Sequence, residues 1–231
     1  GVASMRLSND GVIYNPWQTY TTSQNWTLPS GDGLKRVYVQ FRDTAGNVSS
    51  TYNASITLDQ NPPQGSIIIN NGAVYTTGTD VTLKLSATDP GSGVSDMCFS
   101  NTGTSYSAWQ PYSTTANWVL SAGNGIRTVY AKFIDTMGQV SSVYSDTSAL
   151  GSPVDVVQAK FMADSAFAIL DGVKISAVYN DSIYVQDVAK RNGIKITGIS
   201  SVGVDDIIDI AGIIYTLNSE RHISASIWGK R

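Results

Sequence analysis

The chain has 231 residues, of which 14% are charged and 10% aromatic, and its formal net charge is −3. One cysteine, Cys98, and one histidine, His222, exclude an intrachain disulfide and a zinc site built from several Cys or His side chains. The sequence has no long basic run to recruit nucleic acid or an anionic membrane surface, and no apolar stretch as long as a membrane-spanning helix. Its many Ser, Thr, Asn, Gly and aromatic residues favour twisted sheets joined by tight turns.

The first segment of the chain carries short strand patterns separated by turn residues. Residues 36–41 alternate between apolar and polar side chains, and three apolar residues share one face: Val37, Val39 and Phe41. Asp43 and Gly46 give residues 43–47 turn chemistry, because Asp accepts backbone hydrogen bonds and Gly accepts a positive φ. Residues 48–52 are predicted to form the returning strand. Strands this short and this closely spaced indicate a β-sandwich.

A second set of strand patterns lies between residues 61 and 92. Residues 66–70 and 81–87 are predicted strands, and Asn71–Gly72 between them is a hairpin signal. Residues 89–93 are a predicted turn.

Internal repetition is the strongest feature of the sequence. When Gly1 is placed on Gly93, the two segments align without a gap as far as Asp59 and Gly151, and about half of the positions are identical. The first segment has no counterpart of residues 61–92. We therefore expect its domain to lack two opening strands, which were cut away, lie upstream in a longer protein or come from another chain.

The repeated pattern consists of aromatic, glycine and aspartate residues at fixed spacing. Its motifs are Leu83-x-Leu85-Ser86-Ala87-x-Asp89, Ser92-Gly93-Val94, Trp109-x-x-Tyr112, Trp118-x-Leu120 and Gly31-Asp32-Gly33 followed by Val37-Tyr38-Val39-x-Phe41-x-Asp43. This pattern resembles the tandem Ig-like repeats of large bacterial and archaeal surface or secreted proteins. The resemblance implies stalk, spacer, adhesive or assembly modules, and it brings no catalytic residues with it.

The third segment, after the linker Gly151-Ser152-Pro153, is richer in Ile and Val. Asn180–Asp181 is a hairpin signal and residues 202–206 are a predicted loop. Five strands are predicted, over residues 173–179, 182–186, 194–199, 207–217 and 221–227. Five strands in this length suggest a small barrel.

The motifs of this segment are similar to OB-like barrels attached to secreted bacterial proteins. They are Tyr184 to Asp187, Arg191-Asn192-Gly193-Ile194, Val202-Gly203-x-Asp205, Asp209-x-x-Gly212 and the Glu220-Arg221 hairpin. OB barrels often bind oligonucleotides or oligosaccharides. Residues 152–231 hold eight Lys and Arg against nine Asp and Glu, so a basic groove for nucleic acid is not favoured.

The sequence thus predicts an all-β protein in three parts. Residues 1–60 are a partial Ig-like repeat, residues 61–151 a complete Ig-like repeat, and residues 152–231 an OB-like small β-barrel.

Aromatic side chains are the candidate ligand-binding residues. Trp17 and Tyr20, with their counterparts Trp109 and Tyr112, are candidates for stacking against sugar rings, although packing within the fold is favoured for the two tryptophans. Trp26 and Trp118 are predicted core residues, because each shares a strand face with a leucine two positions later.

Four aspartates are candidates for Ca²⁺, which prefers oxygen ligands: Asp32, Asp43, Asp89 and Asp135. Turn-capping is the favoured role for them, so no cofactor is expected. We expect no catalytic residues either, because the single histidine has no nucleophile motif beside it and Asp205, Asp206 and Asp209 suit a solvated loop. Cys98 is expected in a strand interior or as a chance surface thiol.

The function favoured by these observations is a non-catalytic, secreted or cell-surface structural module of a prokaryote. We expect it to be a stalk or filament subunit that assembles with other protein chains, with donor-strand completion of the first repeat as the hypothesis. Two alternatives remain: a carbohydrate-binding accessory region of a secreted polysaccharide-active enzyme, and an OB-type nucleic-acid binder. Neither nucleic acid nor membrane insertion is expected.

Overall fold

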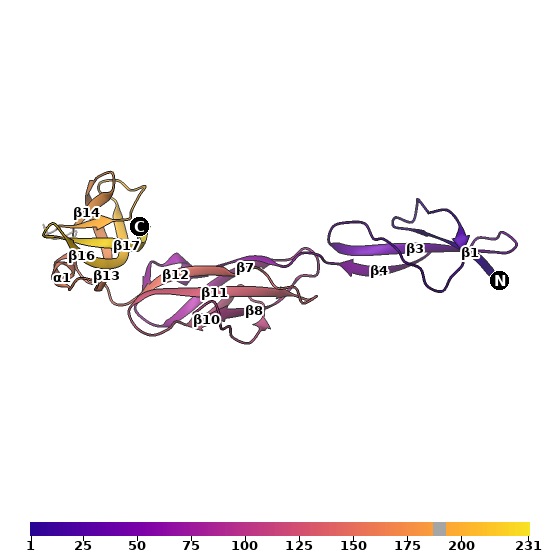
Figure 1. Cartoon of the computed structure of the whole chain (residues 1–231), viewed down its shortest axis with the longest axis horizontal. Helices are drawn as coiled ribbons and strands as arrows, with labels where there is room; N and C mark the ends of the chain where they lie inside the picture. The colour runs from indigo at the N-terminus through magenta and orange to yellow at the C-terminus, as the bar shows by residue number, and fades with distance from the viewer. Residues whose placement is uncertain (187–192) are drawn as a thin grey trace. The chain divides into compact units, whose positions relative to one another are not determined.

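The computed structural model describes residues 1–186 and 193–231 and is built almost wholly of β-strands, as predicted (Figure 1). The chain forms two compact units. Unit 1 comprises residues 1–64, 87–96 and 133–142, and unit 2 comprises residues 65–86, 97–132 and 143–231. Among the described residues, no helix is long and apolar enough to cross a membrane.

The first segment forms a four-stranded sheet in the order β2-β1-β3-β4. Its strands are β1 (Val2–Ser8), β2 (Gln18–Thr19), β3 (Gly33–Asp43) and β4 (Tyr52–Leu58). In the antiparallel register of β1 and β3, Met5 lies opposite Phe41 and Leu7 opposite Val39. Because successive side chains alternate between faces, these apolar residues share one side of the sheet.

Four strands of the second segment begin and end at the positions that the sequence alignment pairs with the first. They are β8 (Val94–Ser100), β9 (Gln110–Pro111), β11 (Gly125–Asp135) and β12 (Tyr144–Leu150), which with β6 (Tyr75–Thr76) form a sheet in the order β6-β12-β11-β8-β9. A second sheet, in the order β10-β7-β5, has no counterpart in the first segment: β5 (Gln64–Ile69), β7 (Asp80–Thr88) and β10 (Thr115–Val119). The apolar side chains of both sheets are buried, and among them Ile69, Leu83, Val129 and Ala131 are 0% exposed. Two sheets with buried inner faces form a β-sandwich.

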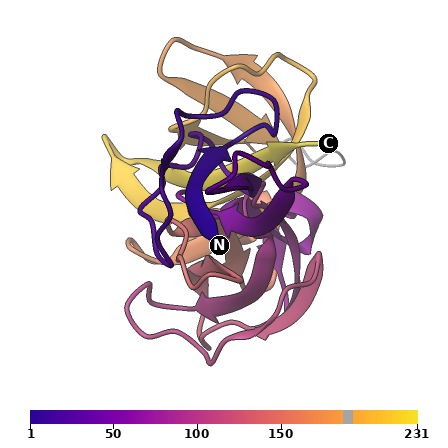
Figure 2. The same ribbon diagram turned by 90° about the vertical axis from the view of Figure 1, so that its right-hand side faces the viewer.

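Residues 163–231 contain a closed barrel of five strands in the order β13-β14-β15-β17-β16. The strands are β13 (Phe167–Val178), β14 (Ser182–Gln186), β15 (Gly193–Thr197), β16 (Ile207–Leu217) and β17 (Glu220–Lys230). The last strand, β17, is drawn yellow and curves strongly (Figure 2). The core of the barrel is built mostly of isoleucine, leucine and valine, including Ile196, Ile210 and Ile223. The OB-like assignment of this barrel stays a prediction, and Asp187, Arg191 and Asn192 of its motif lie outside the described residues.

Local patterns misplaced several elements. The returning strand of the first segment is β4 and not residues 48–52, because Val48 forms only a bridge with Arg42. Asn71–Gly72 does not close a hairpin. It lies in a short 3-10 helix, Asn70–Gly72, after which β6 pairs in parallel with β12 in the other sheet.

A short helix was not predicted. In α1 (Val156–Phe161), the Asp155 side chain accepts a hydrogen bond from the Gln158 backbone N–H, and the Gln158 side chain accepts one from the Asp155 N–H. This capping box is visible in the sequence as Asp-x-x-Gln before an apolar residue. The helix buries Val156 and Ala159 in the barrel core.

Candidate functional site

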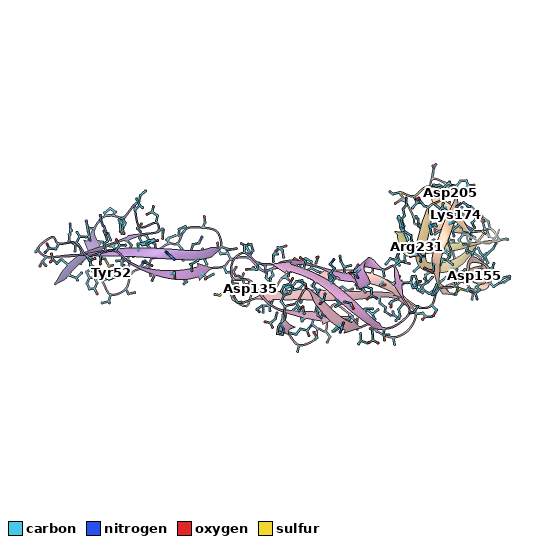
Figure 3. All side chains as sticks on the ribbon, turned by 180° about the vertical axis from the view of Figure 1, so that it is seen from behind. Tyr52, Asp135, Asp155, Lys174, Asp205 and Arg231 are labelled. Atoms are coloured by element: carbon cyan, nitrogen blue, oxygen red, sulfur yellow. The ribbon has the colours of Figure 1, made fainter. Side chains whose placement is uncertain are left out.

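The β2-β1-β3-β4 sheet presents an incompletely covered apolar face. Val37, Val39 and Phe41 on β3 are half-buried, and Tyr52 on β4, labelled in Figure 3, is 55% exposed. These side chains line a groove of about 390 Å³, together with Met5, Leu7, Tyr20, the loop 21–24 and residues 53–54. The loop and Tyr20 shield Val37, Val39 and Phe41 in part, which leaves these side chains half-buried.

The equivalent face of the second segment is closed. Val129, Ala131 and Phe133, which align with Val37, Val39 and Phe41, are each 0% exposed. In the second segment β5, β7 and β10 form the opposing sheet of the sandwich, whereas the corresponding face of the first sheet is only half-buried.

The outer edge of the same sheet is also open among the described residues. β4 pairs with β3 on one side, from Gly33 opposite Leu58 to Val39 opposite Tyr52. Its counterpart β12 has a second neighbour, β6, which β4 lacks. Every residue of β4 from Tyr52 to Thr57 is exposed. An exposed edge offers backbone N–H and C=O groups to another strand.

The two candidate stacking tryptophans lie in different surroundings. The guanidinium groups of Arg6 and Arg42 lie 4.6 Å and 4.5 Å from the Trp17 ring centre. Both form cation–π contacts with the Trp17 ring, which leaves less of the ring available to a sugar. The residues aligned with these arginines are Cys98 and Ile134, and Trp109 is 42% exposed. Trp109 is therefore the more accessible of the two rings.

The two candidate tyrosines are also placed by packing. Tyr20 is 40% exposed and meets Phe41 edge to face with ring centres 5.8 Å apart, on the apolar side of the first sheet. Tyr112 is half-buried. Tyr20 thus belongs to the groove of the first sheet rather than to a platform with Trp17.

The prediction that Trp26 and Trp118 are core residues is too strong, since both are half-buried. Each indole N–H donates to the asparagine 17 positions earlier, Trp26 to Asn9 at 2.7 Å and Trp118 to Asn101 at 2.8 Å. Only Trp118 lies on a strand, because β10 pairs with β7 and residues 23–27 have no such partner among the described residues.

Three carboxylates from distant parts of the sequence meet within unit 1. Asp59 follows β4, Asp89 lies in the turn after β7, and Asp135, labelled in Figure 3, ends β11. One carboxylate oxygen of each lies within 4.8 Å of one from each of the others. Asp135 is only 2% exposed, and the other two are half-buried. Sequence reasoning proposed Asp89 and Asp135 and missed Asp59, for which no local motif exists.

One oxygen of each turn aspartate is used by its own turn. Asp89 Oδ1 accepts backbone N–H groups of Ser92 and Gly93 at 2.8 and 2.9 Å, and Asp135 Oδ1 accepts two amides of its own turn at the same distances. The other oxygen, Oδ2, of Asp59, Asp89 and Asp135 is buried without a hydrogen-bond partner in the described part of the chain, as is Ser92 Oγ.

The other two aspartates proposed for Ca²⁺ do not join this cluster. Asp32 accepts hydrogen bonds from the Gln60 backbone N–H and from the Asn61 side chain. Both carboxylate oxygens of Asp43 are used by its own turn, and these bonds hold the pKa of Asp43 below its usual value, chiefly through the side chain of Asn47. Asp43 therefore caps its own turn, as the sequence favoured, whereas Asp32 binds the segment that follows β4.

His222 is enclosed in a polar network of the barrel and is 3% exposed. Its Nδ1 lies 3.3 Å from the Tyr215 hydroxyl and its Nε2 lies 3.4 Å from Glu220 Oε2. The Tyr184 hydroxyl donates to Glu220 Oε1, and this hydrogen bond raises the pKa of Tyr184 to about 12. The contacts orient the histidine ring and tie β14, β16 and β17 together.

Of the acidic residues predicted to lie in a solvated loop, Asp205 and Asp206 lie in the loop before β16 and Asp209 lies on β16, and all three carry ion pairs. Lys174 binds Asp205 and Lys230 binds Asp206, both at 2.7 Å, and Arg231 pairs with Asp209 at 2.9 Å (Figure 3). Lys230 lowers the pKa of Asp206 below its usual value. Much of the positive charge on this side of the barrel is therefore neutralised within the chain.

No protein-family model matches the chain, and no curated protein sequence does. Among solved structures, the chain is similar to the fibronectin(III)-like modules of CbhA from Clostridium thermocellum, with 11% sequence identity and a TM-score of 0.34. The alignment covers 65% of this chain and 77% of that one. An identity and a TM-score this low carry no argument about function.

Proposed function

We propose that the chain is a non-catalytic extracellular structural module that helps to build a surface stalk or fibre through protein–protein contacts. The observation that carries the proposal is the incompletely covered face of the β2-β1-β3-β4 sheet. The proposed occupant of this face is a pair of β-strands donated by a neighbouring polypeptide chain.

The second segment supports this choice of occupant. There the same face is covered by β5 and β7, whose inward side chains Ile69 and Leu83 are 0% exposed. A donor with the same alternation of apolar and polar residues would bury Val39, Phe41 and Tyr52 in the same way. Burial of apolar area supplies affinity, and the alternating side chains set the register of the donated strands.

The free edge of β4 adds a second element of recognition. A donated strand can form main-chain hydrogen bonds along Tyr52–Leu58, as β6 does beside β12 in the second segment. Because the donor and acceptor surfaces differ, repeated use of one such contact produces an open filament when successive rotations do not close into a ring.

A structural role also agrees with the chemistry of the chain. Its single histidine is buried beside Tyr215 and Glu220, where the ring is held in place and is 3% exposed. Ser, Thr and Asn on short strands without disulfides suit a prokaryotic surface protein.

Light scattering at increasing protein concentration tests this proposal. We expect the wild-type chain to associate and Val39→Lys to remain monomeric, since the substitution puts a charge on the proposed acceptor face. Leu34→Lys is the matched control, because Leu34 lies on the same strand, is 63% exposed and points to the opposite side of the sheet. It should associate as the wild type does.

A synthetic peptide with the sequence of residues 64–88 provides a second measurement. It carries the β5 and β7 patterns and should bind the wild type and Leu34→Lys but not Val39→Lys, as followed by fluorescence anisotropy. A wild-type chain that stays monomeric and does not bind the peptide would rule out strand donation and leave a spacer role.

A carbohydrate-binding role is the second candidate, and the exposure of Trp109 favours it. An exposed indole can stack against a sugar ring, and no arginine lies at the positions that cover Trp17 in the first segment. Glycan binding that is lost in Trp109→Ala and kept in Trp17→Ala would support this function. If the chain binds no member of a polysaccharide panel, the carbohydrate-binding role is ruled out.

A further inference from the structure

We infer that Asp59, Asp89 and Asp135 form a binding site for a divalent cation of the calcium type. The site joins three segments that are distant in the sequence: the end of the first sheet, the turn after β7 and the turn after β11.

The first argument is the unsatisfied hydrogen-bonding capacity of the cluster. Asp135 is 2% exposed, one of its carboxylate oxygens lies within 4.8 Å of one oxygen of Asp59 and of Asp89, and its Oδ2 has no hydrogen-bond donor among the described residues. Asp59 Oδ2 and Asp89 Oδ2 share this condition. A buried carboxylate oxygen without a partner is costly, and buried charges in proteins are paired or coordinate metals.

The second argument is the repulsion among three like charges in a small volume. Their nearest oxygens lie within 4.8 Å of one another, where carboxylates repel, and burial weakens the screening of that repulsion by water. None of the salt bridges identified in the described part of the chain involves these three residues. A bound cation would balance the charge and provide the missing partner for each oxygen.

The third argument comes from the internal repeat. Asp43 and Asp135 occupy equivalent positions and cap equivalent turns through Oδ1. In the first segment, the Asn47 side chain donates to Asp43 Oδ2 at 3.0 Å. In the second, the longer Gln139 replaces Asn47, and its Nε2 donates to the Asp59 backbone oxygen at 3.2 Å. This single exchange frees Asp135 Oδ2 and connects the turn to the segment that carries Asp59.

The fourth argument is the close fit around Asp59. A Cβ atom at Gly91 would lie 2.5 Å from Asp59 Oδ1 and 2.6 Å from its Cγ. Glycine at this position therefore leaves room for the carboxylate to enter the cluster. The turn that begins at Asp89 supplies both one ligand and the space for another.

The ligand chemistry selects a hard cation. The three side chains offer only oxygen, and the buried Ser92 hydroxyl in the same turn is a further oxygen without a partner in the described part of the chain. Ca²⁺ binds six to eight oxygens at about 2.3–2.6 Å, so two of its ligands can be about 5 Å apart, which accommodates the observed span. Mg²⁺ requires about 2.1 Å and keeps several waters, so we expect Ca²⁺ to bind more tightly.

Isothermal titration calorimetry on the full chain, freed of cations with a chelator, tests the site. We expect saturable Ca²⁺ binding with a dissociation constant of about 10⁻⁴ M, within the range of extracellular calcium modules, and weaker binding of Mg²⁺. Asp135→Asn should weaken Ca²⁺ binding at least tenfold while keeping the amide-accepting oxygen that caps the turn. Asp43→Asn is the matched control, because Asp43 has the same turn geometry and should leave Ca²⁺ binding unchanged.

A charge-conserving variant sharpens the test. Gln139→Asn should restore the first-segment arrangement, in which an asparagine side chain donates to the aspartate Oδ2, and should weaken Ca²⁺ binding without removing a carboxylate. If Asp135→Asn does not fold, Asp59→Asn can replace it in this test, because Asp59 lies outside both turns. Circular dichroism melting with and without Ca²⁺ should show stabilisation of the wild type and Asp43→Asn, and little in Asp135→Asn.

Two results would overturn the inference. One is the absence of saturable Ca²⁺ binding to the wild type at millimolar concentrations. The other is Ca²⁺ binding that persists unchanged in both Asp135→Asn and Asp59→Asn, because the cation would then bind elsewhere on the chain.

Discussion

Gly91 and Asp59 approach so closely that a Cβ atom at Gly91 would lie 2.5 Å from Asp59 Oδ1. Gly91 is not among the glycines with a positive φ, so glycine is needed here for space and not for backbone conformation. The two residues come from different strand connections of unit 1, and their contact brings Asp59 beside Asp89 and Asp135.

Gly91→Ala should displace the Asp59 carboxylate. Since that side chain can move, we expect a loss of only about 1 kcal/mol in the free energy of unfolding, at the low end for overpacking, but a clear weakening of Ca²⁺ binding. Gly78→Ala is the control, because nothing lies within 4 Å of a Cβ atom there and no positive φ is required. Urea denaturation and calorimetry measure the two effects, and equal Ca²⁺ affinities in both variants would contradict the prediction.

Gly212→Ala should destabilise the barrel far more. A Cβ atom at Gly212 would overlap the Ser224 carbonyl oxygen, a backbone atom of the paired strand β17 that cannot move without breaking the ladder. We expect a cost of about 3 kcal/mol or more in the free energy of unfolding. Gly203→Ala, whose nearest neighbour would be 3.8 Å away, should unfold at nearly the wild-type urea concentration.

The two half-buried tryptophans should differ in their contribution to stability. Trp118 packs edge to face on Phe99 with ring centres 5.6 Å apart, and Leu7 stands at the position equivalent to Phe99 in the first segment. We expect Trp118→Ala to cost about 2–3 kcal/mol, somewhat less than a fully buried tryptophan, and Trp26→Ala about 1 kcal/mol. Chemical denaturation of both variants checks the order, and a larger loss for Trp26→Ala would contradict it.

Tyr184 should make the stability of the barrel depend on pH in the alkaline range. Its pKa rises from 10.0 to about 12 because its hydroxyl donates to Glu220, so the folded state holds the proton more tightly than the unfolded state does. The resulting stabilisation is fully present below pH 10 and is lost as the pH rises toward 12.

Tyr184→Phe removes this hydrogen bond and should show a smaller loss of stability over that pH range than the wild type. The ultraviolet absorbance of tyrosinate, compared between the two proteins, reports the ionisation directly. A wild-type titration in which every tyrosine ionises near its ordinary pKa would count against the prediction.

The sequence predicted strands well where the alternation of residues is itself the cause of burial. Residues 207–217 were predicted as a strand and form β16 with the same bounds, because most residues there are β-branched or apolar and Ile208, Ile210 and Ile214 are buried in the barrel. The start of β13 at Phe167 was missed, since Asp171 and Gly172 interrupt the pattern where the strand bends and its register with β16 shifts.

The features that were missed depend on partners distant in the sequence. Residues 23–27 repeat the pattern of β10 but form no strand, because pairing with a neighbour such as β7 is what fixes an extended segment. Asp59 joins the acidic cluster only because the chain folds the turns of Asp89 and Asp135 beside it. The spacing of residues around Asp59 in the sequence does not indicate this contact. The exchange of Asn47 for Gln139 was visible, but its effect on hydrogen bonding required the contact with Asp59.

The burial of Cys98 makes the labelling rate of its thiol a measure of how often the surrounding structure opens. The thiol is 2% exposed within β8, so reagents have little access to it. Burial also raises the pKa of Cys98, and the resulting scarcity of thiolate further protects the thiol from alkylation. Reagents would therefore modify Cys98 only when the β-sandwich of the second segment opens transiently. Since Cys98 is the single cysteine, its labelling rate in the folded protein would measure how often the structure around β8 opens, without any engineered probe.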